Sequence, residues 1–247
     1  MLGQFFSHHD TKYNVVILAG GPGTRMGMAS DHIPKALTKI GSQRAIDLIM
    51  NKLLLVAHRF IVGTGWHADL LESYVRGRYS SQPLFFSQEG TQDLKSNAVS
   101  LMYALDAADS RVGTIVSFCD LVLLSNPEVV GNALYLATPE TEGVVGTFRH
   151  SVGLQGDVVR KIIAHRKPQP ITDLKNGVVG FFVFSNTLLL KEVVYSLARA
   201  DKLKDITTDV VSRYVAAEET KGVVVDALLE FGTEDDLKHV RKLWETY

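Results

Sequence analysis

Short apolar segments alternate along this chain with longer segments that carry apolar residues at spacings of three and four. We expect strands at 14–18, 59–64, 83–87, 113–118, 143–148 and 177–184. We expect helices at 45–58, 67–77, 97–109, 127–137, 186–199, 207–217 and 234–244. Strands that are apolar on both sides belong in a sheet with helices on both faces. The order therefore predicts an α/β fold, in which a doubly wound, mostly parallel, Rossmann-like mixed sheet is flanked by helices.

The length and composition favour one large domain. The chain has 247 residues, of which 46% are hydrophobic, so it can bury a sizeable core. We expect residues 1–13 to form a leader and 14–247 to form the domain. The segment 165–173, with two prolines and two basic residues, predicts a loop inside a smaller subdomain. The apolar run at 222–231 is a further element near the end of the chain.

Charge and cysteine content exclude some classes of function. The net charge of −1 gives no overall electrostatic reason to bind nucleic acid or a membrane surface. The single cysteine, Cys119, cannot form an internal disulfide and is expected to be buried. The sequence shows no signal peptide and no run long enough for a membrane span. These features predict a cytoplasmic protein.

A turn rich in glycine follows the first strand, where an open α/β sheet binds its ligands. It contains Gly20, Gly21 and Gly23, and it ends in Arg25, with Lys35 ten residues later. The chain lacks the GK[ST] step of a P-loop, and its glycines do not match the spacing of a dinucleotide fingerprint. Glycines let backbone N–H groups approach a phosphate chain, and the two cations would neutralise it. The turn therefore predicts a phosphate site of another kind.

The segment LAGGPGTRM at 18–26, followed by IPKAL at 33–37, resembles the signature of the nucleotidyltransferases that activate sugar 1-phosphates and related phosphorylated metabolites. Looser likenesses to the same family occur at 61–75, 116–124, 176–185 and 228–237. Together they cover about residues 14–240. The resemblance implies a nucleotide-binding part at about 14–125, an acceptor-side part at about 126–232 and a closing helix at 233–247.

The resemblance also implies a reaction and a set of site residues. An acceptor phosphate oxygen attacks the α-phosphorus of a nucleoside triphosphate, and pyrophosphate leaves. Arg25 and Lys35 would be catalytic, while Asp120 and Glu230 would bind Mg²⁺. The remaining positions are nucleotide-binding Leu18, Ala19, Gly20, Gly21, Gly23, Thr24, Gln88 and Asn97, and acceptor-binding Asn176 and Gly177.

Several of these positions have competing interpretations. Glu230 stands where the family carries aspartate, so Asp226 is an alternative second metal ligand, and both could instead cap surface turns. Asn97 could be a helix N-cap. Asn176 with Gly177 is also an ordinary turn dipeptide.

The acceptor is less well defined than the reaction. Transfer to a sugar 1-phosphate is a frequent reaction in the family, and this favours a sugar 1-phosphate as the acceptor. The segment DLKSNAVSLMYAL and the step SFCD instead resemble the branch that transfers CMP to phosphocholine or to phosphonates. A cationic acceptor such as choline would need an aromatic cage, for which Trp66 is a candidate, although packing is the first expectation for it.

A different class of function is a regulatory relative that binds a nucleotide sugar without turnover. Such relatives usually lose the arginine, the lysine or the metal carboxylate, whereas Arg25, Lys35 and Asp120 are all present. The expected partners are therefore a nucleoside triphosphate and a phosphorylated small molecule, with a possible homo-oligomer and with no nucleic acid or membrane.

Overall fold

A computed structural model describes residues 11–26, 32–88, 96–125, 129, 131–144 and 146–245. Its centre is a sheet of nine strands. In spatial order the strands are β5 (Leu84–Gln88), β4 (Ala57–Thr64), β1 (Tyr13–Leu18), β6 (Gly113–Phe118), β11 (Gly177–Phe184), β8 (Ala133–Ala137), β12 (Lys221–Val224), β10 (Val158–Pro170) and β9 (Thr147–Gln155). Strands β11 and β10 run against the other seven. The predicted mixed, mostly parallel sheet is confirmed.

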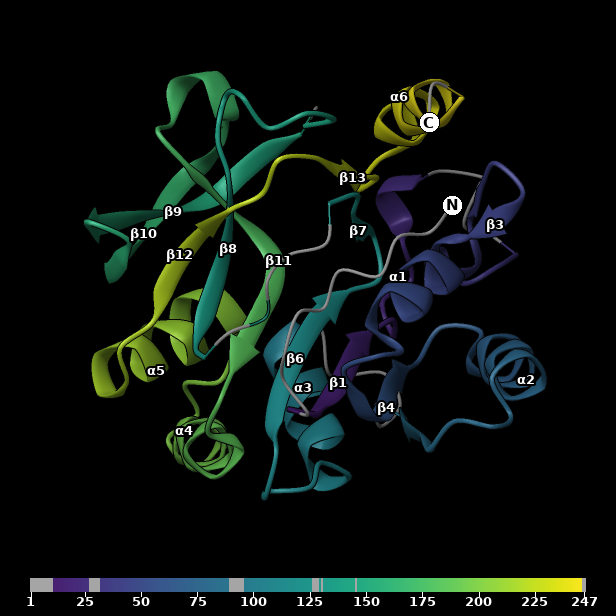
Figure 1. The fold of residues 1–247 in the computed structure, drawn as a ribbon, viewed down its shortest axis with the longest axis horizontal. Helices are drawn as coiled ribbons and strands as arrows, with labels where there is room; N and C mark the ends of the chain where they lie inside the picture. The colour runs from purple at the N-terminus through teal and green to yellow at the C-terminus, as the bar shows by residue number, and fades with distance from the viewer. Residues whose placement is uncertain are drawn as a thin grey trace.

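Helices cover both faces of this sheet (Figure 1). The residues of β1 alternate between two cores: Val15 and Ile17 pack in one, while Val16 and Leu18 pack in the other. The first core is closed by α1 (Ala45–Leu53), α2 (Ala68–Arg78) and α6 (Glu234–Trp244). The second is closed by α3 (Asn97–Asp106), α4 (Thr187–Arg199), the π-helix η4 (Ile206–Val211) and α5 (Ser212–Ala217). Burial on both faces explains why β1 is apolar throughout.

Shorter elements join distant parts of the chain. Strand β7 (Leu121–Leu123) pairs antiparallel with β13 (Leu228–Glu230), and Figure 1 shows both near the start of α6. Strands β2 (Lys39–Ile40) and β3 (Gln43–Arg44) form a small hairpin. Two 3-10 helices are η2 (Lys35–Leu37) and η3 (Ile171–Asp173). The β7–β13 pair matters for the site, because β7 follows directly after β6 and its pairing brings β13 to that place.

The structure corrects several expected elements. The helix expected at 127–137 is wrong at residues 133–137, which form the fully buried strand β8. Residues 127, 128 and 130 lie outside the described part of the chain. A buried strand and a buried helix segment are equally apolar, so spacing alone does not separate them. The strand expected at 143–148 is instead β9, which begins at Thr147. The first strand, expected at 14–18, begins one residue earlier, because Tyr13 is the first residue of β1 and is buried.

The segment 165–173 is not a loop, because most of it belongs to strand β10. Its prolines are accommodated because the pairing with β9 shifts register between Ala164 and Gln169. Where the register shifts, some strand residues make no N–H hydrogen bond to the neighbouring strand. Proline, which has no N–H, is tolerated at such positions. Many residues of this hairpin are exposed, which accounts for its polar composition.

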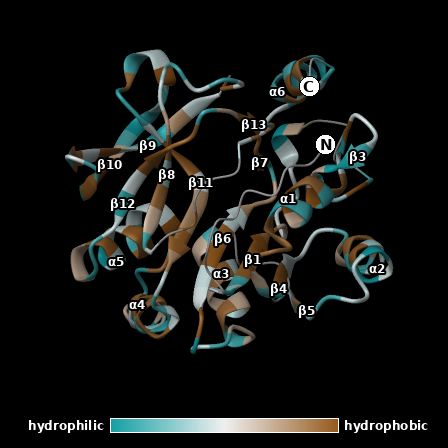
Figure 2. Ribbon diagram, in the orientation of Figure 1, coloured by the Kyte–Doolittle hydropathy of each residue, from teal (hydrophilic) through white to brown (hydrophobic). Residues whose placement is uncertain are grey.

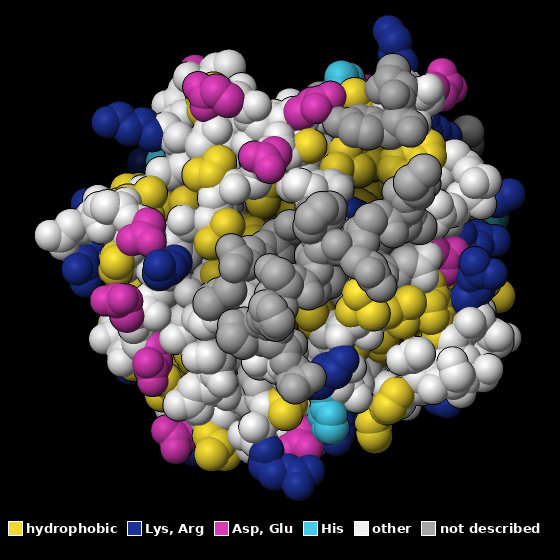
Figure 3. All heavy atoms as spheres, viewed as in Figure 1, with side chains coloured by type: hydrophobic (Ala, Val, Ile, Leu, Met, Phe, Trp, Pro, Cys, Tyr) yellow, Lys and Arg dark blue, Asp and Glu magenta, His cyan; other side chains and the backbone are white. Residues whose placement is uncertain are grey.

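Hydrophobic residues concentrate on the central strands, and hydrophilic residues colour the outer helix α2 (Figure 2). Acidic and basic side chains are interspersed over the face in Figure 3, in keeping with the net charge of −1. Within the described residues, no helix is both long enough and apolar enough to cross a membrane.

Candidate active site

The glycine turn is anchored on both sides at the carboxyl edge of the sheet. Ala19 donates its N–H to the carbonyl of Gly63 at 2.9 Å, which extends the pairing with β4. Cys119 donates to the carbonyl of Leu18 at 3.2 Å, which extends the pairing with β6. Leu18 and Ala19 are buried, so they hold the turn in place through their backbone.

A close approach between two glycines fixes where the turn begins. A Cβ atom on Gly65 would lie 2.5 Å from the carbonyl oxygen of Gly20, so a larger residue would push the turn away. The next residue, Trp66, donates its N–H to the same carbonyl at 2.9 Å. The end of β4 therefore sets the position of Gly20.

The rest of the turn is open and polar. Gly23 has φ of +64°, a conformation that favours glycine. Met26 is buried and donates to the carbonyl of Gly23 at 2.8 Å, which closes the turn. Gly21, Thr24 and Arg25 are exposed. This combination leaves backbone and a guanidinium facing solvent, as a phosphate site requires.

Lys35 and Asp120 form an ion pair, although the family resemblance implied separate partners for them. Lys35 lies on η2 and is 8% exposed, and its ammonium also stands 6.0 Å from the ring centroid of Phe231. Asp120 follows β6, which is next to β1 in the sheet. The pair therefore places a cation and a carboxylate beside the glycine turn.

The register of β7 and β13 brings Glu230 to Asp120. Glu230 pairs with Leu121, and the N–H of Phe231 donates to the carbonyl of Asp120 at 3.1 Å. Burial, together with the negative charges of Asp120 and Asp236, raises the pKa of Glu230 to about 7. The structure thus brings together the two carboxylates that the sequence singled out from distant segments.

Arg25 reaches the same cluster from the other side. A Cβ atom on Gly232 would lie 3.7 Å from a guanidinium nitrogen of Arg25. The charges of Lys35 and Arg25 both oppose the rise in the pKa of Glu230. Asp236 is committed elsewhere, because its carboxylate accepts the N–H of Thr233 at 2.8 Å in the cap of α6.

The alternative carboxylate, Asp226, lies at the opposite end of this strand pair. Leu228 pairs with Leu123, and Leu124 donates to the carbonyl of Ala227, so Asp226 lies beyond the end of β7 that is distant from Asp120. Its side chain is exposed. The register therefore favours Glu230 as the partner of Asp120.

Gln88 and Asn97 flank a segment, 89–95, that lies outside the described residues. Gln88 is the exposed last residue of β5 and pairs with Thr64 of β4, so it stands on the same sheet edge as the glycine turn. Asn97 is the first residue of α3, and its side-chain oxygen accepts the N–H of Ile206 at 2.9 Å. Asn97 thus ties α3 to η4, and a nucleotide contact for it stays a prediction.

Asn176 and Gly177 have clear structural roles. The buried amide of Asn176 accepts the N–H of Val152 at 2.8 Å and donates to its carbonyl at 3.3 Å, so it replaces a strand partner. A Cβ on Gly177 would lie 2.4 Å from the ring of Phe148. Both residues hold the start of β11 against β9, and direct contact with an acceptor stays a prediction.

The two tryptophans differ in their surroundings. Trp244 packs closely against Gly41, where an added Cβ would lie 2.4 Å from the indole nitrogen. Trp66 is 47% exposed and meets His67 edge to face, with ring centroids 4.8 Å apart. The expectation that Trp66 packs into the protein was wrong, and its aromatic surface is available beside the glycine turn.

The carboxylates of the cluster are suited to a metal ion that is only partly held by the protein. Among residues 11–26, 32–88, 96–125, 129, 131–144 and 146–245, no group of three His, Cys, Asp or Glu side chains is arranged to hold one. Asp120 and Glu230 are two carboxylates, and Mg²⁺ is commonly held by one or two carboxylates with the rest of its shell from water and phosphate oxygens. The residues therefore fit a cation that shares its ligands with a bound triphosphate.

The sequence missed two features of the site. The pairing of Lys35 with Asp120 depends on the three-dimensional approach of η2 to the end of β6, which no local pattern encodes. Phe231, which is fully buried, lies next to Glu230 and under the Lys35 ammonium. The position of Phe231 in the EFGT segment could have indicated this role, since an aromatic ring beside Glu230 can pack against a neighbouring cation.

Comparison with known proteins identifies the family. Residues 15–179 match the model of the MobA-like NTP transferase domain, and the chain belongs to that family. A 2-aminoethylphosphonate cytidylyltransferase from Lancefieldella rimae is 29% identical over 113 residues, which are 45% of this chain. The match spans 44% of the length of that relative.

Solved structures share the fold over nearly the whole chain. The CTP:phosphocholine cytidylyltransferase from Streptococcus pneumoniae has a TM-score of 0.75 at 16% identity, covering 94% of this chain and 99% of that one. A putative glucose-1-phosphate thymidylyltransferase from Bacillus anthracis has a TM-score of 0.73 at 15% identity, covering 95% and 96%. The inositol-1-phosphate CTP transferase from T. maritima has a TM-score of 0.69 at 18% identity, covering 95% and 96%.

Proposed function

We propose that this protein transfers a nucleoside monophosphate from a nucleoside triphosphate to a small molecule that carries a phosphate or phosphonate, with release of pyrophosphate. The observation that carries the proposal is the cluster of Arg25, Lys35, Asp120 and Glu230 beside the glycine turn. Four ionisable side chains from four separate segments meet at the carboxyl edge of the sheet, where α/β proteins bind ligands. Membership of the NTP transferase family supports this interpretation.

In this proposal the glycine turn and Arg25 hold the triphosphate. The open backbone from Gly21 to Thr24 approaches the phosphate chain, and the guanidinium neutralises the charge that builds on its oxygens. Lys35 leaves Asp120 when substrate arrives and bridges the α-phosphate and the attacking oxygen of the acceptor. Transfer of this kind depends mainly on alignment and charge neutralisation, so no covalent intermediate with the protein is needed.

Asp120 and Glu230 would hold a divalent cation, most simply Mg²⁺, when nucleotide is bound. Bound there, the ion would neutralise phosphate oxygens and help to align the α-phosphorus. In the free protein Lys35 neutralises the charge of Asp120, and burial favours the protonated form of Glu230. Cation binding is therefore expected to be weak without nucleotide and tighter with it.

For the substrates we propose CTP and a non-sugar acceptor such as a phosphonate or phosphocholine. The sequence match to a 2-aminoethylphosphonate cytidylyltransferase supports this choice, and the exposed ring of Trp66 could face a cationic group. A sugar 1-phosphate is the second candidate, since the fold of a putative thymidylyltransferase for glucose 1-phosphate is nearly as similar. In both cases the same phosphate cluster performs the transfer.

A pyrophosphate-release screen tests the proposal. Five nucleoside triphosphates are combined with 2-aminoethylphosphonate, phosphocholine and a panel of sugar 1-phosphates in the presence of Mg²⁺. We expect release with CTP and one of the first two acceptors. Release only with sugar 1-phosphates would select the second candidate, and no release with any pair would favour the non-catalytic regulatory alternative.

A further inference from the structure

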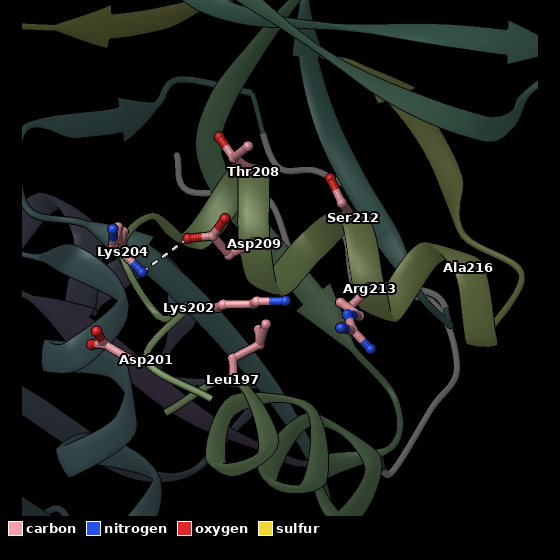
Figure 4. Close-up of a pocket in the computed structure, with 9 residues that line it drawn as sticks. All are labelled: Leu197, Asp201, Lys202, Lys204, Thr208, Asp209, Ser212, Arg213 and Ala216. Carbon is pink, nitrogen blue, oxygen red and sulfur yellow. Dashed lines mark hydrogen bonds between the residues drawn. The ribbon is translucent and has the colours of Figure 1, made fainter. Parts of the chain in front are cut away.

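A pocket lies away from the glycine turn, between the end of α4, the π-helix η4 and α5 (Figure 4). Its volume is about 500 Å³, within the usual range for small-molecule sites. The residues that line it are Leu197, Asp201, Lys202, Lys204, Thr208, Asp209, Ser212, Arg213 and Ala216. None of them belongs to the predicted nucleotide or acceptor site.

The cations of this pocket lack carboxylate partners. In the part of the chain that the structure describes, Lys202, Lys204 and Arg213 form no ion pair. In Figure 4 the ammonium of Lys202 points toward the guanidinium of Arg213. Two cations that face each other across a cavity repel, and an anion placed between them would relieve that repulsion.

The two carboxylates of the pocket do not neutralise these cations. Asp209 accepts the backbone N–H groups of Lys204 at 2.9 Å and of Asp205 at 2.8 Å with one oxygen. Asp201 sits in a left-handed turn with φ of +55°, and Figure 4 shows its carboxylate directed away from the Lys202 ammonium. The lining carries three cations against these two carboxylates, so its net charge is positive.

We propose that this pocket binds a small phosphate-bearing anion, independently of the site at the glycine turn. The ligand would lie between Lys202 and Arg213. The hydroxyl of Ser212 makes only a 3.4 Å bond to the carbonyl of Thr207, so it can turn toward the ligand. Arginine and lysine together suit a phosphate group, one through its planar fork and the other as a mobile point charge.

The pocket is also connected to the start of α3. The carbonyl of Lys204 accepts the hydroxyl of Ser96, and the N–H of Ile206 donates to Asn97 at 2.9 Å. A ligand that holds the segment 202–209 would also hold these bonds. Amide exchange at Ile206 should therefore slow when the pocket is filled.

Calorimetric titration with inorganic pyrophosphate tests the site. The active site also attracts pyrophosphate, so the titration uses the variant with Arg25→Ala and Lys35→Ala, after its thermal unfolding confirms that it folds. We expect this variant to bind pyrophosphate, and Lys202→Ala with Arg213→Ala in the same background to weaken binding by at least about tenfold. Arg199→Ala is the matched control, since Arg199 is exposed on α4 but does not line the pocket.

Two results would overturn the inference. One is absence of binding to the Arg25→Ala and Lys35→Ala variant, and the other is an equal loss with Arg199→Ala. Should the background variant fail to fold, amide shifts of the wild-type protein decide the matter. Shifts at 202–213 that vanish in Lys202→Ala with Arg213→Ala support the site, and shifts confined to the glycine turn contradict it.

Discussion

The ammonium of Lys35 donates to a carboxylate oxygen of Asp120, so the two predicted reaction-site residues are bound to each other when no substrate is present. This pair gives the site a stable resting arrangement of charges. In the proposed reaction, substrate phosphates replace Asp120 as the partner of Lys35, and the cation replaces Lys35 as the partner of Asp120. The pair therefore links binding of phosphate to release of the carboxylate.

The first prediction concerns Lys35. Lys35→Ala should lower kcat by at least about 100-fold, because the ammonium is expected to stabilise charge that develops during transfer. It should also lower the free energy of unfolding by about 2–3 kcal/mol, since it leaves a partly buried carboxylate unpaired. Steady-state kinetics and urea unfolding measure the two effects. Lys39→Ala is the control, because Lys39 is exposed on β2, and equal losses in both variants would contradict the assignment.

The second prediction separates the carboxylates. Asp120→Asn should abolish nearly all activity, Glu230→Asp should keep part of it, and Asp226→Asn should behave like the wild type, because Asp226 lies at the wrong end of the β7–β13 pair. The Mg²⁺ dependence of pyrophosphate release is the measurement. A large rise in the Mg²⁺ requirement of Asp226→Asn would transfer the second ligand role to that residue.

The third prediction is a pH dependence of stability in the metal-free protein. The pKa of Glu230 is raised to about 7 from an ordinary value of 4.5, so the folded state binds a proton more tightly than the unfolded state. The stability from this proton is fully present below pH 4.5 and is lost as the pH rises to about 7. The loss is on the order of 3 kcal/mol. Thermal unfolding with chelator should show it, and Glu230→Gln should remove this part of the pH profile.

The fourth prediction concerns the close approach of Gly65 to Gly20. Gly65→Ala should weaken nucleotide binding, because the added methyl would collide with the carbonyl that begins the glycine turn. Gly77→Ala is a matched control on α2, where an added Cβ meets nothing within 4 Å. That change should raise stability by up to about 1 kcal/mol. Nucleotide titration of both variants tests the idea, which fails if Gly65→Ala binds like Gly77→Ala.

The fifth prediction concerns Asn176. Asn176→Ala should lower the free energy of unfolding by about 1–3 kcal/mol, because it leaves the N–H and carbonyl of Val152 without partners. Thr172→Ala, at an exposed position, is the control. A rise in KM for the acceptor with unchanged stability would instead support a direct contact with the acceptor.

The sequence predicted the parts of the fold whose patterns are local. Strand β11 and helix α6 occur where their apolar spacing predicted them. Strand β11 lies buried within the sheet, and α6 packs one apolar face against the protein. Strands β8 and β10 were missed for opposite reasons. The first is so apolar that it looks helical, and the second is so polar and rich in proline that it looks like a loop.

The residue types of the candidate site can be read from the sequence, but their spatial arrangement cannot. The glycine turn, Arg25 and Lys35 lie in one stretch of sequence, and their types alone indicate phosphate chemistry. Asp120 lies near Glu230 because β7 pairs with β13. Asn176 accepts a hydrogen bond from Val152 because β9 lies beside it. Those contacts are long-range, so no spacing in the sequence reports them.

The pairing of β7 with β13 also sets the order in which the site can be assembled during folding. The glycine turn, Lys35 and Asp120 belong to the first half of the chain, whereas Glu230 comes only with β13. Closing such a long loop is entropically slow, so the strand pair should form late. A partly folded chain would then present the phosphate-binding turn before it can present a complete cation site. Turnover that depends on the proposed cation would therefore have to wait until β13 has paired with β7.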